Sequence, residues 1–123
     1  MEKKIYYDNG YFIGEVEFRY EQDGCQYYRR QGNGTMYYNN GMTMKGFWKD
    51  DKLNGYAEIK YDDGDEFKGQ FVNGRKHGKG TYKYYKSGNV YDVVMNQNKC
   101  VMKKFNHKEE MIKEVKNESD FSM

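Results

Sequence analysis

Residues 67–84 read FKGQFVNGRKHGKGTYKY, and residues 44–61 read MKGFWKDDKLNGYAEIKY. Large apolar residues, glycines and lysines recur at matching positions in the two stretches, which start 23 residues apart. A third copy, which matches the other two less closely, begins at Tyr91. A fixed period of this size is typical of stacked supersecondary units. We therefore expect an array that presents a surface, and we look for function on that surface.

Each copy contains two segments of strand length, the first built around one glycine and the second opening with Gly-x-Gly or a variant of it. Alternate side chains of a strand point to opposite faces. One face would then carry glycines and large apolar residues, and the other would be mostly polar. Glycine inside a strand marks a close approach by another group. We expect that group to be an aromatic ring from a neighbouring strand.

Tight-turn pairs separate these segments, at Asn40-Gly41, Asp63-Gly64, Asn73-Gly74 and Ser87-Gly88. Each repeat is therefore predicted to be a β-hairpin. Hairpins joined by further turns form one antiparallel meander. The predicted fold class is all-β, with a single sheet of consecutive hairpins.

The two ends of the chain depart from the period. The first hairpin is predicted to be lengthened over residues 15–28 and to turn at Asp23-Gly24. After residue 105 the apolar spacing becomes helical, at Lys108, Met111, Ile112 and Val115. We thus predict a repeat sheet over 1–105 and a short amphipathic helix with a tail over 106–123, the helix packing on the last hairpin.

Composition limits the functional classes. The chain has 123 residues, enough for one domain, and its 21 basic against 19 acidic residues give no argument for nucleic acid. Fourteen Tyr, 7 Phe and 14 Gly with no Pro favour strands and turns. Cys25 and Cys100 have no metal-ligand spacing, so we expect reduced thiols. No apolar run reaches the ~18 residues of a membrane span. We expect a soluble, cytoplasmic protein.

Candidate catalytic and metal sites have simpler interpretations. His77 lies among basic residues without a nucleophile nearby, so a structural role is expected. The stretch 78–81, Gly-Lys-Gly-Thr, lacks the spacing and the following helix of a phosphate loop. The acidic cluster falls on a turn that already favours Asp and Gly, at Asp62, Asp63, Asp65 and Glu66. We predict no enzyme activity, no cofactor and no bound metal.

The repeat residues resemble the MORN (membrane occupation and recognition nexus) repeat family, most clearly at residues 67–84. The pattern covers about residues 5 to 99. Departures are Met44 for an aromatic residue, Leu53-Asn54 for a Lys-His stretch, and Ala57 and Val93 for glycines. The resemblance implies an elongated, twisted antiparallel sheet whose aromatic face forms a shallow groove. It also implies that the chain is part of a scaffold in a cytoskeletal, ciliary or membrane-linked assembly.

Three functional hypotheses follow. The aromatic groove would bind a protein partner, with an amphipathic helix as the favoured occupant, through Phe12, Trp48, Tyr61, Phe71, Tyr82, Tyr84 and Tyr91. Alternatively, the polar face would contact anionic phospholipids through Lys60, Lys68, Lys79 and Lys83, although these lysines would equally keep an open sheet soluble. Thirdly, the edge strands near Tyr6 and Val101 would pair with other chains in a larger assembly.

Overall fold

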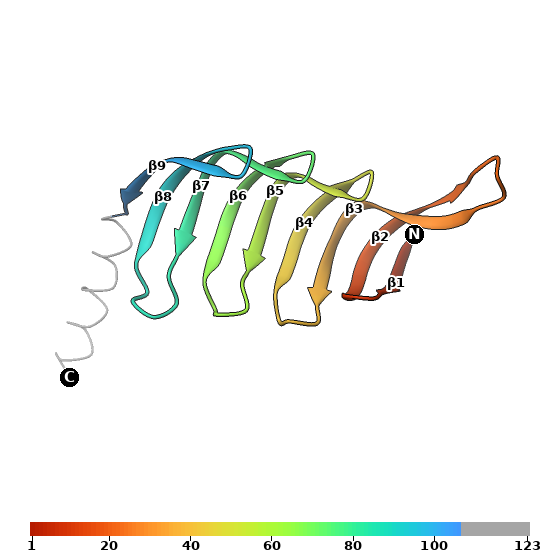
Figure 1. Cartoon of the computed structure of the whole chain (residues 1–123), viewed down its shortest axis with the longest axis horizontal. Coiled ribbons are helices and arrows are strands. Elements are labelled where there is room, and N and C mark those ends of the chain that lie inside the picture. Colours follow the sequence, from red (N-terminus) through yellow and green to blue (C-terminus); the bar gives the residue numbers. More distant parts are fainter. Residues whose placement is uncertain (107–123) are drawn as a thin grey trace.

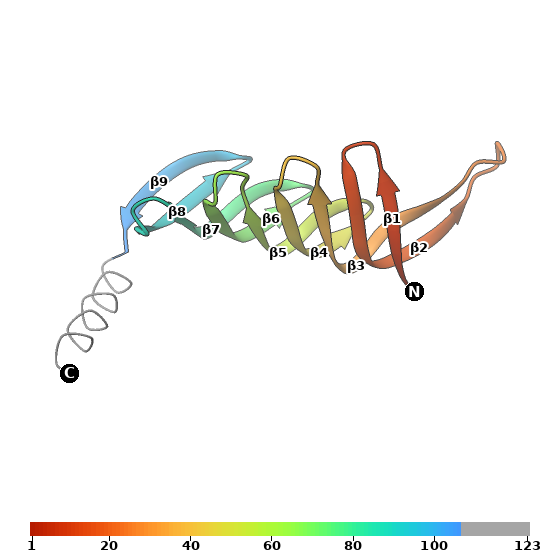
Figure 2. The ribbon, with the colours of Figure 1, turned by 90° about the horizontal axis from the view of Figure 1, so that it is seen from below.

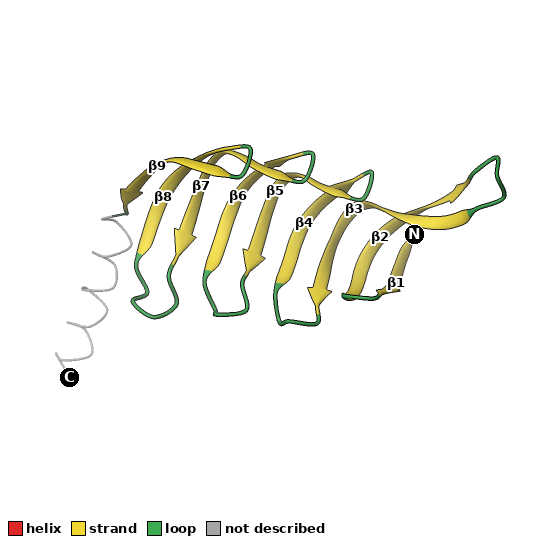
Figure 3. Cartoon of the chain, in the orientation of Figure 1, coloured by secondary structure: helices red, strands yellow, loops and turns green. Residues whose placement is uncertain are grey.

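A computed structural model describes residues 1–106, which form a single nine-stranded sheet (Figure 1). The strands are β1 (Glu2–Tyr7), β2 (Gly10–Tyr20), β3 (Gln26–Tyr38), β4 (Thr43–Lys49), β5 (Lys52–Lys60), β6 (Glu66–Val72), β7 (Arg75–Lys83), β8 (Val90–Asn96) and β9 (Lys99–Phe105). Each strand pairs antiparallel with the next in sequence, and only strands and loops occur in this part of the chain (Figure 3). The predicted all-β meander is confirmed. The predicted C-terminal helix lies outside the described residues.

Three turns along one side of the sheet share a side-chain hydrogen bond: those between β3 and β4, between β5 and β6, and between β7 and β8. In each, a side-chain oxygen accepts from the backbone N–H two residues later. The pairs are Asn40 with Met42 at 2.9 Å, Asp63 with Asp65 at 2.9 Å, and Ser87 with Asn89 at 3.1 Å. The glycine between the partners has a positive φ in each case. These are predicted turn pairs, and their chemistry is that of Asx and Ser turns.

Three turns on the opposite side are two-residue loops, at Asp50-Asp51, Asn73-Gly74 and Gln97-Asn98. Both residues of each loop have positive φ, as in the type I′ turns that suit the twist of a hairpin. The sequence predicted only the middle loop, because the other two lack glycine. Asp51 is held by Arg30, whose backbone N–H and Nε donate to its carboxylate at 2.8 and 3.2 Å.

Three strands carry a bulge at the same level of the repeat. The bulges contain Gly32, Gly55 and Gly78, with φ of +115°, +107° and +95°. The register shifts there on β3, β5 and β7. Bulges bend a strand and increase its twist. Because the three lie in register, every repeat bends at the same place, and one part of each hairpin lies across the rest (Figures 1 and 2).

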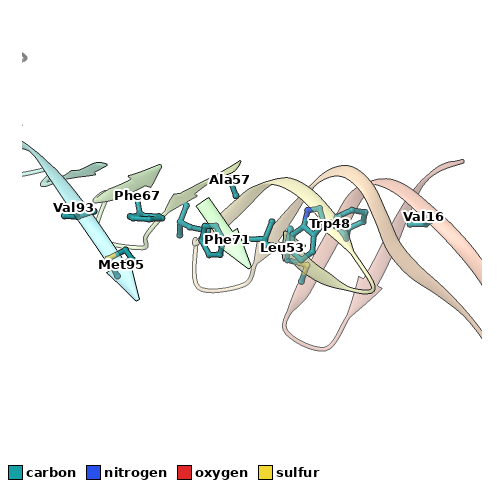
Figure 4. Packing of buried hydrophobic residues seen from close by; sticks show 11 residues of the cluster. Val16, Trp48, Leu53, Ala57, Phe67, Phe71, Val93 and Met95 are labelled. Atoms are coloured by element: carbon teal, nitrogen blue, oxygen red, sulfur yellow. The ribbon is translucent and has the colours of Figure 1, made fainter. Parts of the chain in front are cut away.

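The bend encloses the core of the protein (Figure 4). Eleven hydrophobic residues in the described part are buried: Phe12, Val16, Met36, Trp48, Leu53, Ala57, Ile59, Phe67, Phe71, Val93 and Met95. Rings from the two sides of the bend meet edge to face, with centroids 5.5 Å apart for Phe12 and Trp48 and 5.8 Å for Phe67 and Phe71. The sheet thus covers much of its own apolar face.

Glycines under the rings make this packing possible. A Cβ on Gly34 would lie 2.2 Å from Cζ of Phe12, and one on Gly80 would lie 2.9 Å from Cζ of Phe67. Each ring reaches the glycine from the neighbouring strand, which confirms the predicted close approach. In the middle repeat the same positions hold Met44 and Ala57.

The hairpin of β2 and β3 extends beyond the other strands of the sheet (Figure 2). Strand β2 continues to Tyr20 and β3 begins at Gln26, in the region where the sequence predicts a lengthened hairpin. At its tip the Asp23 carboxylate accepts from the Cys25 N–H at 2.9 Å. Near its base Glu17 accepts from Arg19 and Arg29, and these two hydrogen bonds lower the pKa of the Glu17 carboxyl.

Candidate interaction surface

Three of the seven predicted groove residues belong to the core. Phe12, Trp48 and Phe71 are 0%, 3% and 4% exposed. The sequence predicted an open sheet without a second layer, whose aromatic face would need a cover from outside. The bend supplies that cover. We therefore correct their assignment: these three rings offer almost no surface to a partner.

The other four predicted groove residues form a continuous row of half-buried rings. Centroid distances are 5.9 Å from Tyr61 to Tyr82, 4.9 Å from Tyr82 to Tyr84 and 5.6 Å from Tyr84 to Tyr91. Phe105 on β9 continues the row at 5.4 Å from Tyr91. We call these five rings the tyrosine ladder. Phe105 was not among the predicted groove residues, because its strand follows the last recognisable repeat.

Two lysines lie over the ladder. Nζ of Lys76 is 5.1 Å from the ring centroid of Tyr61, and Nζ of Lys103 is 4.5 and 4.6 Å from those of Tyr84 and Tyr91. Each ammonium also donates to a ladder hydroxyl, Lys76 to Tyr61 and Lys103 to Tyr84. The hydrogen bond to Tyr84 raises the pKa of Lys103. The ladder therefore carries positive charge near both ends, which cation–π contact favours.

A comparison between repeats shows that, among residues 1–106, Lys76 has no carboxylate partner of the kind that Arg30 has. Arg30 occupies the corresponding position two repeats earlier, over the Trp48 ring. There the backbone N–H of Arg30 donates to the carboxylate of Asp51, and the guanidinium pairs with it. The N–H of Lys76 donates instead to the amide oxygen of Asn98, at 2.9 Å. A neutral side chain thus stands beside Lys76 where a carboxylate stands beside Arg30.

The acidic cluster at residues 62–66 takes part in structural contacts. Asp65 accepts from the Tyr82 hydroxyl at 2.9 Å and from the Tyr85 N–H at 2.8 Å. Burial and this carboxylate raise the pKa of Tyr82, so its phenol stays neutral and donates. Glu66 lies 4.0 Å from Lys60. Within residues 1–106 no cluster of His, Cys, Asp or Glu could hold a metal ion.

The four predicted lipid-binding lysines are exposed on the opposite face, at Lys60, Lys68, Lys79 and Lys83. Acidic residues alternate with them across the strands. Lys68 pairs with Glu58, and Glu66 pairs with both Lys60 and Lys83. Lys68 and Lys79 also line a shallow hollow of about 510 Å³ that reaches Met102 and Lys104 on β9. The face is a mixed-charge surface with a local excess of lysine.

A family model for the MORN repeat matches residues 27–43, 45–66 and 67–88. The chain belongs to the MORN repeat family. The matched segments run from β3 to the turn after β7, which places the three bulges and most of the core inside the repeats. No curated protein matches the chain. MORN repeats are generally protein- or membrane-interaction modules and are typically non-enzymatic.

Other sequence candidates lie on the surface. His77 is exposed on β7, where it lines a second hollow with Lys52 and Arg75. Cys25 and Cys100 are exposed free thiols. Across residues 1–106 we find no helix with the length and apolar character to cross a membrane.

Proposed function

We propose that this MORN array is a scaffold whose tyrosine ladder binds a segment of a partner protein. The observation that carries the proposal is that the five ladder rings lie half-buried in an unbroken row of ring contacts, whereas Phe12, Trp48 and Phe71 are enclosed in the core. Aromatic rings with polar tips are favoured at protein interfaces, since they bury a large area and still donate hydrogen bonds. An amphipathic helix that lays its apolar side on the rings is the occupant we favour.

The lysines over the ladder favour acidic residues on that helix. The ammonium groups of Lys76 and Lys103 already lie against rings, so they are held in place before a partner arrives. Charge complementarity of this kind contributes mainly to specificity and to the rate of association. We expect a partner whose apolar stripe is flanked by Asp or Glu.

Affinity capture from native cells tests the ladder. The variant Tyr84→Ala with Lys103→Glu is expected to lose at least about tenfold of the recovered partner, as removal of an interface anchor does. Tyr85→Ala is the matched control, because Tyr85 is the next residue and is 69% exposed. Melting temperatures establish that all variants are folded. Equal recovery by the wild type and the ladder variant would reject the proposal.

Contact with an anionic membrane is the second candidate. It is favoured by the exposure of Lys60, Lys68, Lys79 and Lys83 on one face, where each lysine near a lipid surface contributes about 1 kcal/mol. Flotation with phosphatidylserine vesicles at low salt should then exceed flotation with neutral vesicles, and changing all four lysines to Glu should remove the difference. Equal flotation with both vesicle types would exclude this candidate.

Placement in a cytoplasmic cytoskeletal or ciliary assembly is a proposal supported by the family resemblance alone. Imaging of the tagged chain in its native cells tests it. A uniform distribution that is lost on mild detergent extraction would count against such an assembly.

A further inference from the structure

A row of basic residues follows the three two-residue turns at Asp50-Asp51, Asn73-Gly74 and Gln97-Asn98. The residue directly after each of these turns is Lys52, Arg75 or Lys99. All three are exposed, and the exposed Lys49 lies directly opposite Lys52 on its hairpin. We call these four residues the basic row. Like charges placed opposite one another destabilise a hairpin, so the row favours a functional explanation.

No carboxylate of the described strands and turns neutralises the basic row. The ion pairs of residues 1–106 include none of its members. In the acidic turn that precedes Lys52, Asp50 pairs with Arg29 at 3.1 Å. The second acid of that turn, Asp51, pairs with Arg30 at 3.2 Å. The two later turns contain only Asn, Gly and Gln. The positive charge of the row is therefore available to a ligand.

Two hollows lie along the basic row and share Arg75. The first, of about 450 Å³, is lined by Lys52, Val72, Asn73, Arg75, His77 and Gln97. The second, of about 360 Å³, is lined by Arg75, Asn96, Gln97 and Lys99. The Arg75 guanidinium donates to Oε1 of Gln97 at 3.3 Å, and this contact holds it between the two hollows. Both hollows thus combine positive charge with neutral polar side chains, and no acidic residue lines either one.

The lining groups suit a phosphate. A phosphoserine carries a charge of about −1.5 to −2 and three strong acceptor oxygens. The guanidinium of Arg75 can donate to two of these oxygens at once, and Lys52 and Lys99 add an ammonium donor to each hollow. In the first hollow, Asn73 and His77 supply further side-chain N–H groups. A carboxylate has only two oxygens and a smaller charge, so it would leave more of these donors unused.

The spacing of the hollows defines the conformation of the ligand. Arg75 lies two strands away from Lys52 and from Lys99, so neighbouring hollows are about 10 Å apart. In the polyproline II conformation, residues i and i+3 lie on the same side of the chain and about 9 Å apart. The geometry points to one ligand: we propose that the basic row binds a partner segment in this conformation with two phosphoserines three residues apart, one phosphate in each hollow.

The probe is a fluorescein-labelled peptide, Ala-pSer-Pro-Pro-pSer-Ala, in which pSer is phosphoserine. Fluorescence anisotropy with the full chain is expected to show saturable binding with a Kd below about 1 mM. The isomer Ala-Pro-pSer-pSer-Pro-Ala has the same charge but adjacent phosphates, so it can fill only one hollow. It should bind about tenfold more weakly, because the second contact is lost.

Variants of the chain locate the contact, and melting temperatures establish that they are folded. Arg75→Gln should weaken binding of the probe at least about tenfold, because Arg75 lines both hollows. Lys99→Gln removes charge from the second hollow alone, so the two isomers should then bind within about twofold of each other. Lys86→Gln is the matched control, an exposed lysine in the turn between β7 and β8. Tyr84→Ala should leave probe binding unchanged, which separates this site from the tyrosine ladder.

Several results would overturn the proposal. They are no saturation up to about 1 mM probe, equal binding of the two isomers to the wild type, undiminished binding by Arg75→Gln, and loss of binding with Tyr84→Ala. Displacement of the probe by an equal concentration of inorganic phosphate would reduce the site to one for free phosphate. Flotation with phosphatidylcholine vesicles that contain phosphatidylinositol bisphosphate, lost in Arg75→Gln and without probe binding, would make a membrane the ligand instead.

Discussion

Replacing Trp48 with alanine is expected to lower the free energy of unfolding by about 3–5 kcal/mol, the usual cost of truncating a buried large aromatic residue. Trp48 is 3% exposed and its ring meets Phe12 edge to face. The indole Nε1 also donates to the carbonyl oxygen of Gly34 at 3.0 Å, and the guanidinium of Arg30 lies 4.5 Å from the ring centroid. The substitution leaves a cavity and removes both contacts at once. Such a loss is a large fraction of the free energy of unfolding of a small domain, which is about 5–15 kcal/mol.

Far-ultraviolet circular dichroism with urea is the appropriate measurement, because Trp48 is the only tryptophan and its removal abolishes the tryptophan fluorescence. Trp48→Phe provides the control. It keeps a ring in the core and loses the indole hydrogen bond, so it should cost less than the alanine variant. A Trp48→Ala protein with undiminished stability would show that Trp48 lines an open groove, as the sequence predicted.

The alternation of residue types predicted which side each residue occupies, but could not predict the bend. Period-two spacing correctly placed Trp48 and Tyr82 on the apolar face and Lys68 on the polar one. The bend depends on positive φ at Gly32, Gly55 and Gly78. The sequence alone does not specify the φ that a glycine adopts. The available signal was the recurrence of these glycines at the repeat spacing, each two residues before a second small residue.

The candidate site was predicted only where its residues carry the repeat. Tyr61, Tyr82, Tyr84 and Tyr91 were found because they recur as aromatic positions. Lys76 and Lys103 were missed, since a lysine over a ring depends on which strands are neighbours and on what neutralises the charge. The contrast between Asp51 and Asn98 became meaningful only when both proved to bond the equivalent backbone N–H.

Gly34→Ala is expected to destabilise the fold by about 1–3 kcal/mol, the usual cost of overpacking a core. Its new methyl group would lie 2.2 Å from Cζ and 2.6 Å from Cε1 of Phe12. No positive φ is involved at this position, so the expected cost comes from the collision with the ring and the nearby backbone of Gly14. Urea unfolding followed by circular dichroism measures it. An unchanged midpoint would mean that the ring moves aside without cost.

The middle repeat shows how the destabilisation caused by a methyl group at this position can be offset. Ala57, equivalent to Gly34, is fully buried and its methyl group lies opposite Gly46, while Met44 occupies the position of Phe12. Methionine is flexible enough to share the space with that methyl group. Phe12→Met combined with Gly34→Ala should therefore be more stable than the sum of the two single changes indicates, by about 0.5–3 kcal/mol. Simple additivity would contradict the view that ring size and the small residue beneath it vary together from repeat to repeat.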